Sequence, residues 1–276
     1  MSVFSVCSIK GAPGVTTLTC LIGATWPVRR RVFVAEADES GGDLSARFSL
    51  SSRRGWATLS ASIRRDGVGS SLEEHLQQLP GGLEVLVAAR PHDVPAATSP
   101  EGNVVRFAAH GGDDDRDVLV DLGRVGCGRP TPGAWLEQSD AVVIVARSDA
   151  ATAVQLRERS PALLDASSGP VGLAVVGEGG PRGRELSAFT GIPLFGEVPH
   201  DPSGAAVASG TDRRARRLHR SPLPVASSRL AAALVEMVEQ TDGDTELDTA
   251  GSSAGATDGR SVGTDPDRRA WEQADR

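Results

Sequence analysis

The N-terminal segment constrains the fold more than any other part of the chain. Val3–Ser8 is short, apolar and β-branched, which is typical of a buried strand. A loop with glycines at both ends, residues 11–14, follows it, and apolar residues at helical spacing then predict a helix over residues 15–26. Residues 32–37 predict a second strand. A strand, a glycine loop, a helix and a strand in this order indicate the start of a parallel βαβ unit.

The same alternation continues along most of the chain. It predicts further strands at residues 83–89, 118–121, 141–146, 171–176 and 192–198, and helices at residues 56–64, 71–78, 150–165 and 224–240, with one more helix within residues 91–110. Nearly continuous Val, Ile and Leu runs indicate strands that are buried on both faces. We therefore expect an α/β fold with a mostly parallel, doubly wound sheet flanked by helices.

Composition narrows the class of protein. The chain has 276 residues, 39% of them hydrophobic, which is enough for one α/β domain with a large core. A net charge of −7 argues against a uniformly basic nucleic-acid binder. The sequence shows no transmembrane run, no secretory leader and no metal or disulfide spacing among its three cysteines, so we expect a cytoplasmic protein.

The C-terminal segment has a different composition. Residues 241–276 are acidic and rich in Gly, Ser and Asp, with almost no large apolar side chains. Such a segment cannot bury enough surface to offset the entropy lost on ordering. The expected organisation is one domain over residues 1–240 and a disordered tail over residues 241–276.

The glycine loop carries the strongest functional signal. It reads Lys10-Gly11-Ala12-Pro13-Gly14-Val15-Thr16-Thr17, and Lys10 is the only lysine in the chain. Small residues allow backbone N–H groups to surround a phosphate, and the start of the following helix adds its positive end. Thr16 would offer its hydroxyl to Mg²⁺. An ordinary glycine and proline turn between a strand and a helix is the alternative interpretation.

This loop resembles the deviant Walker A motif of the ParA/MinD ATPases, K-G-G-x-G-K-[ST]-[ST]. Lys10 matches the signature lysine of that family, and the last two positions match Thr16 and Thr17. Gly11 and Gly14 match glycines, Ala12 replaces a third glycine, and Val15 replaces the lysine that contacts the β and γ phosphates. The resemblance covers about residues 1–240. A turn at residues 79–83, Leu-Pro-Gly-Gly-Leu, is also similar to the TadZ/CpaE branch.

The resemblance implies roles for other residues. Asp38 takes the place of the carboxylate that orients the attacking water, and Asp121 the place of the Walker B acid that holds Mg²⁺ with Thr16. Lys10 would reach the phosphates of the partner subunit's nucleotide across a dimer and act in catalysis. The implied ATP-binding residues are Lys10, Gly11, Ala12, Pro13, Gly14, Val15, Thr16, Thr17, Pro199 and Asp201. Each acid also has a plainer interpretation, because Asp is common where parallel strands end, and Glu36 is expected to be structural.

Val15 sets this chain apart from the motif that it resembles. Valine offers neither charge nor hydrogen-bond donor, and losing a charge-assisted bond to phosphate costs on the order of 1.5–3 kcal/mol. Affinity for ATP would fall by about ten- to a hundredfold. Lys10, or Arg124 acting as an arginine finger, are two candidate substitutes for the missing lysine. We expect weak or slow ATP hydrolysis.

Partners are also implied by the resemblance. It implies a homodimer with ATP and an unknown protein partner. Basic surface in ParA proteins binds DNA without sequence preference, and the matching candidates here are Arg213, Arg214, Arg216, Arg217 and Arg220. A solvated loop is the alternative for this run. MinD ends in a basic amphipathic membrane helix that this chain lacks, so no membrane binding is expected.

Three functions remain open at this point. The first is a dimeric, nucleotide-dependent switch for chromosome or plasmid partitioning or for positioning machinery. The second is a non-hydrolysing scaffold or regulator that acts through protein partners. The third is a metabolic ligase of the dethiobiotin-synthetase or cobyrinate-synthase kind. Val15 counts against the third, because those enzymes need the P-loop lysine.

Overall fold

The computed structural model describes residues 1–11, 13–27, 29–67, 71–88, 90–93, 116–126, 133–177, 182–212 and 214–253, with backbone alone for residues 215–217 and 241–253. The chain divides into two units, Met1–Val238 and Glu239–Arg276. The sheet and the candidate site belong to the first unit. None of the described helices is long and apolar enough to span a membrane.

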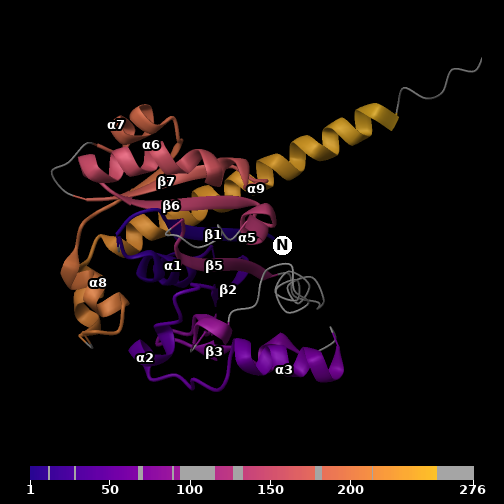
Figure 1. Ribbon diagram of the computed structural model, residues 1–276, viewed down its shortest axis with the longest axis vertical. Helices are drawn as coiled ribbons and strands as arrows, with labels where there is room; N and C mark the ends of the chain where they lie inside the picture. The colour runs from indigo at the N-terminus through magenta and orange to yellow at the C-terminus, as the bar shows by residue number, and fades with distance from the viewer. Residues whose placement is uncertain are drawn as a thin grey trace, which may run out of the picture. The chain divides into compact units, whose positions relative to one another are not determined.

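A single sheet organises the first unit (Figure 1). Its strands within the described residues are β1 Val3–Ser8, β2 Arg31–Glu36, β3 Gln77–Gln78, β4 Glu84–Leu86, β5 Arg116–Arg124, β6 Ala141–Arg147, β7 Val171–Val176 and β8 Leu194–Val198. They lie in the order β3-β4-β2-β5-β1-β6-β7-β8, and every neighbouring pair is parallel except β3 and β4. The expected mostly parallel α/β sheet is confirmed.

Helices connect these strands. The described α-helices are α1 Val15–Ala24, α2 Leu44–Phe48, α3 Trp56–Asp66, α5 Gly133–Glu137, α6 Ala150–Asp165, α7 Gly183–Thr190, α8 Pro202–Ala208 and α9 Leu223–Ser253, and short 3₁₀ helices span Leu72–Glu74, Pro91–Asp93 and Ala215–Arg220. The sequence did not predict α2, α5, α7 or α8. Each has eight residues or fewer, which is too short to show a helical hydrophobic pattern.

Both faces of the sheet are covered, as expected for a doubly wound fold. Successive side chains of a strand point to opposite faces, and β1 sends Val3 and Cys7 into one apolar cluster and Phe4 and Val6 into the other. Helices α3, α5, α6 and α7 pack into the first cluster, and α1 and α9 into the second. Figure 1 shows α6 and α7 lying together beside β6 and β7. The fully apolar strands are therefore buried on both sides.

The helix predicted over residues 71–78 is wrong. Leu72–Glu74 is a 3₁₀ helix, and Gln77–Gln78 forms β3, which pairs antiparallel with β4. Between these strands the N–H of Gly82 donates to the carbonyl of Leu79 (2.9 Å), which closes a tight turn. The strand pairing satisfies the backbone in place of a helix. The buried leucines of this segment have helical spacing, although the segment forms a 3₁₀ helix and a short strand.

Two other helix limits differ from the expectation. Within residues 91–110, Pro91–Asp93 is a 3₁₀ helix, and residues 94–110 lie outside the described residues. Helix α9 does not end near Gln240 but continues to Ser253. Residues 241–253 contain no proline, and a helix that is already formed gains a hydrogen bond with each added residue. Residues 254–276 lie outside the described residues, so the disordered tail stays a prediction there.

Candidate functional site

The glycine loop joins the end of β1 to the start of α1. Gly11 has a φ of 72° and Gly14 a φ of 91°, in the left-handed region that glycine adopts without strain. Gly14 caps α1, and its carbonyl accepts the N–H of Leu18 (2.8 Å). The first N–H groups of α1 therefore face the loop without partners inside the helix. Ala12, one of the expected loop residues, lies outside the described residues.

Val15, at the position of the missing lysine, belongs to the core. Its exposed fraction is 6%, and it packs in the same apolar cluster as Phe4 and Val6 of β1. Its carbonyl accepts the hydroxyl of Thr19 (2.9 Å). The Val15 side chain thus gives the loop no charge and no hydrogen-bond donor, and it does not line the cavity that begins there.

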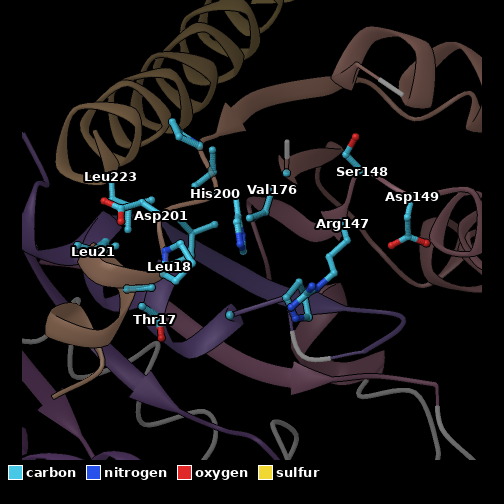
Figure 2. Close-up of a pocket in the computed structure, with 17 residues that line it drawn as sticks. Thr17, Leu18, Leu21, Arg147, Ser148, Asp149, Val176, His200, Asp201 and Leu223 are labelled. Atoms are coloured by element: carbon cyan, nitrogen blue, oxygen red, sulfur yellow. The ribbon is translucent and has the colours of Figure 1, made fainter. Parts of the chain in front are cut away.

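A cavity of about 420 Å³ begins at this loop and ends beside α8 (Figure 2). Its polar end is formed by Gly14, Thr17, Arg147 and Ser148. The rest of its wall combines the apolar side chains of Leu18, Leu21, Val176, Val198 and Leu223 with the polar side chains of His200 and Asp201. A cavity with a cation at one end and apolar side chains mixed with polar groups at the other suits a ligand that has a charged group and a flat ring with hydrogen-bonding edges.

Two residues expected at the adenine end line this cavity. Pro199 and Asp201 follow β8 and lie on its wall. The Oδ1 atom of Asp201 accepts the N–H of Gly204 (3.0 Å) and so caps α8. That hydrogen bond is the main reason why the pKa of Asp201 is lowered. Asp201 therefore positions the start of α8 beside the cavity through a side-chain hydrogen bond from the helix backbone.

Asp121 and Thr16 come together on the other side of the loop. Asp121 lies in β5 with an exposed fraction of 0%, and its Oδ1 atom accepts the N–H of Gly123 (3.0 Å). Burial raises the pKa of Asp121 to about 6, although the Thr16 hydroxyl and the Gly123 N–H both favour its charged form. Within the described part of the chain, Oδ2 of Asp121 is buried without any hydrogen-bond partner. A buried acceptor of this kind is suited to a cation.

The residues at this site suit Mg²⁺, which keeps phosphate and water ligands, better than a cation that is coordinated only by protein atoms. No group of three or more His, Cys, Asp or Glu side chains with ligand geometry occurs among the described residues. Mg²⁺ commonly takes one or two protein oxygens and completes its shell with phosphates and water. Thr16 and Asp121 supply such a pair, so a Mg²⁺ ion here would depend on a bound phosphate.

Asp38 lies beside Asp121. Its Oδ1 atom accepts the N–H of Ser40 (2.7 Å), which shapes the loop after β2. A methyl group added at Gly123 would overlap Oδ2 of Asp38, so this carboxylate rests directly on the glycine backbone. The charge of Asp38 also contributes to the raised pKa of Asp121. The fold thus brings Thr16, Asp38 and Asp121 close to one another.

Glu36 fixes the loop after β2 through hydrogen bonds from backbone N–H groups. It is 1% exposed, and its carboxylate accepts N–H groups from Asp43 (2.6 Å), Leu44 (2.9 Å) and Ala88 (2.9 Å). Burial raises the pKa of Glu36 to about 7, although these hydrogen bonds oppose the shift. All three partners are backbone groups, so Glu36 fixes the start of α2 to the segment after β4.

Cations lie at the loop and at the strand ends beside it. Lys10 is half-buried, and Arg124 is exposed at the end of β5. Arg147, which ends β6 and is exposed, lines the cavity and was not foreseen. A charged residue that closes a very apolar strand is a weak signal in a single sequence. Only the cavity distinguishes Arg147 from other surface arginines.

The arginine run near residue 215 is only partly described. Arg213 lies outside the described residues, and the side chains of Arg216 and Arg217 are not described. Arg214 is exposed and pairs with Asp212 (2.9 Å), and Arg220 is exposed. A DNA-binding surface here stays a prediction.

Comparison with known proteins places the fold. No protein-family model matches the chain, and no curated protein sequence does. Solved structures match well, among them the cell division protein MinD of Aquifex aeolicus, with a TM-score of 0.66 and 17% identity over 86% of this chain and 97% of that one. A ParA family ATPase from Chlorobium tepidum TLS has a TM-score of 0.65 and 15% identity over 84% of this chain and 98% of that one.

A third match carries a nucleotide. The septum site-determining protein MinD of Pyrococcus horikoshii OT3, complexed with Mg-ADP, has a TM-score of 0.60 and 17% identity over 83% of this chain and 94% of that one. The chain therefore has the fold of the MinD and ParA ATPases over most of its length. At this level of identity the likeness establishes the fold alone.

Proposed function

We propose that this chain binds Mg²⁺-ATP weakly, hydrolyses it slowly, and acts as a dimeric positioning or partitioning switch of the ParA/MinD kind. The observation that carries this proposal is the cavity of about 420 Å³ that opens at the glycine loop. Backbone N–H groups at the start of a helix favour a phosphate. The apolar walls beyond Leu18 and Leu21 favour a base. The MinD structure with Mg-ADP supports the choice of ligand.

The acids beside the loop fit a metal-assisted phosphoryl transfer. Mg²⁺, when bound, would neutralise charge on the phosphates. Thr16 and Asp121 would hold the ion, and Asp38 would orient a water molecule by accepting a hydrogen bond from it. Glu36 would keep this loop closed through its three backbone partners. Asp38 touches the Gly123 backbone, so movement of either segment would move the other.

The proposed dimer gives Lys10 its role. Lys10 would reach a nucleotide held by a second copy of the chain. We place the protein in the cytoplasm, with a protein partner or DNA as the object that it positions. Arg214 and Arg220, both exposed, would belong to the DNA-binding surface.

One observation favours a second function. Val15 is buried in the core, so the loop lacks the donor on which ATP hydrolysis usually depends. A protein of this fold that does not hydrolyse ATP would act as a scaffold or regulator through protein partners. The two functions differ in whether nucleotide changes the state of the chain.

Equilibrium binding decides first whether a nucleotide binds. Mg²⁺-ATP and Mg²⁺-ADP are titrated by calorimetry into the purified full-length chain and into Lys10→Ala. The proposal expects micromolar to high-micromolar binding by the natural chain. Absence of binding at millimolar nucleotide would leave the scaffold function. Sedimentation with and without ATP then tests the dimer, and the ATP-dependent dimer should be lost in Lys10→Ala.

A further inference from the structure

We propose that Arg147 takes the place of the missing P-loop lysine and binds the β and γ phosphates of the nucleotide. This inference rests on the proposed function and assigns the phosphate-binding cation of the same cavity. Among the described residues that line the cavity, Arg147 is the only lysine or arginine. A triphosphate held there would meet no other permanent positive charge on the wall.

The strand order places the end of β6, where Arg147 lies, next to the end of β1, where the glycine loop begins. Strands β1 and β6 are parallel neighbours, and their last pair is Cys7 with Ile144. Arg147 is the last residue of β6 and pairs with Val176 of β7, whereas β1 has already ended at Ser8 and the chain has entered the glycine loop. The end of β6 and this loop line the same cavity. Figure 2 shows the Arg147 side chain running from the end of β6 towards this loop.

The lining of the cavity links Arg147 to the phosphate end. The same cavity is lined by Pro13, Gly14 and Thr17 of the loop and by Arg147. Phosphate held by the first N–H groups of α1 would therefore lie on the same side of the cavity as the guanidinium group. Arginine has five N–H donors in a planar fork that suits two phosphate oxygens at once.

Arg147 has its charge available. The structure gives its side chain no ion-pair partner within the described ranges, although Asp149 lies two residues away. The carboxylate of Asp149 instead accepts the N–H (2.7 Å) and the hydroxyl (2.9 Å) of Thr152 and caps α6. Asp149 lines the same cavity, but its hydrogen bonds go to Thr152 and the structure does not pair it with Arg147.

The position of Lys10 also supports a phosphate site at the end of β6. The pKa of Asp149 is lowered overall: burial raises it, but the hydrogen bonds from Thr152 and the positive charge of Lys10 outweigh burial. Lys10 is therefore near enough to the end of β6 to act on Asp149. Lys10 and Arg147 flank the loop, and Val15 between them is buried in the core. A buried valine at position 15 is tolerated because the charge enters from β6.

The test compares ligands that differ only in phosphate number. Calorimetry measures the Kd of Mg²⁺-ATP, Mg²⁺-ADP and AMP for the full-length chain, Arg147→Ala and Arg147→Lys. The exposed residue Arg229 on α9 lies outside the cavity lining, and Arg229→Ala serves as a matched control. Arg124→Ala tests the other candidate for the missing charge.

We expect Arg147→Ala to weaken ATP and ADP binding by about ten- to a hundredfold and AMP binding by less than about threefold. Arg147→Lys should recover part of the loss, and Arg229→Ala should bind like the natural chain. A larger loss of ATP binding in Arg124→Ala than in Arg147→Ala would overturn the inference. Equal losses for ATP and AMP would mean that Arg147 contacts the base or ribose, and would overturn the inference. Unchanged ATP binding in Arg147→Ala, with normal binding by the natural chain, would overturn it while leaving the proposed function standing. If the natural chain binds no nucleotide, both fail together.

Discussion

The two strands beside β1 give the glycine loop opposite surroundings. On the β5 side lie the acids Glu36, Asp38 and Asp121, and the first and last of these are almost completely buried. On the β6 side lie the cavity and Arg147, whose side chain is exposed. The acids accept hydrogen bonds from backbone N–H groups, whereas the structure gives Arg147 no ion-pair partner among the described residues.

In the proposed site, the residues that would hold Mg²⁺ and the cation that would bind phosphate therefore lie on opposite sides of the loop. The β5 side is fixed before any ligand arrives, because its carboxylates are already placed by the fold. On the β6 side, the exposed Arg147 has no ion-pair partner among the described residues. The buried Val15 removes the link between the two sides, since a lysine at that position would contribute its charge from the loop itself. The following variants test whether the two sides act separately.

The largest expected effect comes from Asp121. Asp121→Asn removes the negative charge but can keep the hydrogen bond from the N–H of Gly123. If Asp121 holds Mg²⁺, the variant should lose about a hundredfold of the Mg²⁺-dependent part of ATP affinity, which is the upper range for loss of support at a metal site. Binding measured with and without Mg²⁺ checks this.

Asp121→Asn should weaken Mg²⁺-ATP binding but stabilise the ligand-free protein. The native pKa of Asp121 is about 6, above its ordinary 3.8, so its charged form is costly in the folded chain. Above pH 6, Asp121→Asn should raise the free energy of unfolding of the ligand-free protein by up to about 3 kcal/mol. Asp165→Asn, at an exposed site, is the control. If Asp121→Asn bound ATP with the same Mg²⁺ dependence as the natural chain, Asp121 would not be a ligand of the ion.

A smaller gain is expected when the lysine is restored. Val15→Lys should strengthen ATP binding by about tenfold if its ammonium group reaches the loop. Val15→Met, which is apolar and similarly long, is the matched control for the change in packing. In the Arg147→Ala background, Val15→Lys should recover most of the lost affinity, because the two cations would serve one phosphate site. Strictly additive effects would show that the introduced lysine and Arg147 act at separate places.

The acid side was largely predictable from sequence. Strands that are nearly continuous in Val, Ile and Leu can be buried only in a covered parallel sheet, and the ends of such strands meet at one edge. Asp38 follows β2 and Asp121 lies in the neighbouring strand β5, and the family motif had already pointed to both residues. The failure at residues 71–78 had a physical cause. Leu72, Leu76 and Leu79 are all buried, but a 3₁₀ helix and a tight turn bury them as well as a helix would.

The cavity side was much less predictable. Its walls come from α1, the end of β6, β7, β8 and α9, which are far apart in the sequence. No local pattern marks Arg147, because only the packing of β6, α1 and the glycine loop around one cavity brings it to the candidate site. Short helices such as α8 close the cavity, and they carry too few residues to show a period. Tertiary contacts, which a single sequence does not display, decide this half of the site.

Protonation of Glu36, on the β5 side of the loop, should make the free energy of unfolding depend on pH. Its native pKa is about 7 and its ordinary value 4.5, so between these values the folded chain keeps a proton that the unfolded chain has released. The stability due to Glu36 is therefore full below pH 4.5 and is lost as pH rises towards 7. Denaturant unfolding at pH 5 and pH 8 should show this loss, at most about 3 kcal/mol, and Glu36→Gln should remove it. An unchanged pH dependence in Glu36→Gln would assign the effect elsewhere.

The smallest expected effect isolates the contact between Asp38 and Gly123. Gly123 has a φ of 59°, and an added methyl group would overlap the Asp38 carboxylate. Gly67 has a φ of 80°, and a methyl group there meets no atom within 4 Å among the described residues. Both Gly→Ala changes should cost about 1 kcal/mol from backbone strain, but only Gly123→Ala should also displace Asp38. ATP binding on the β6 side should survive Gly123→Ala while phosphate release slows. Equal release rates for the two variants would show that Asp38 takes no part in hydrolysis, and lost binding would show that the two sides of the loop are coupled.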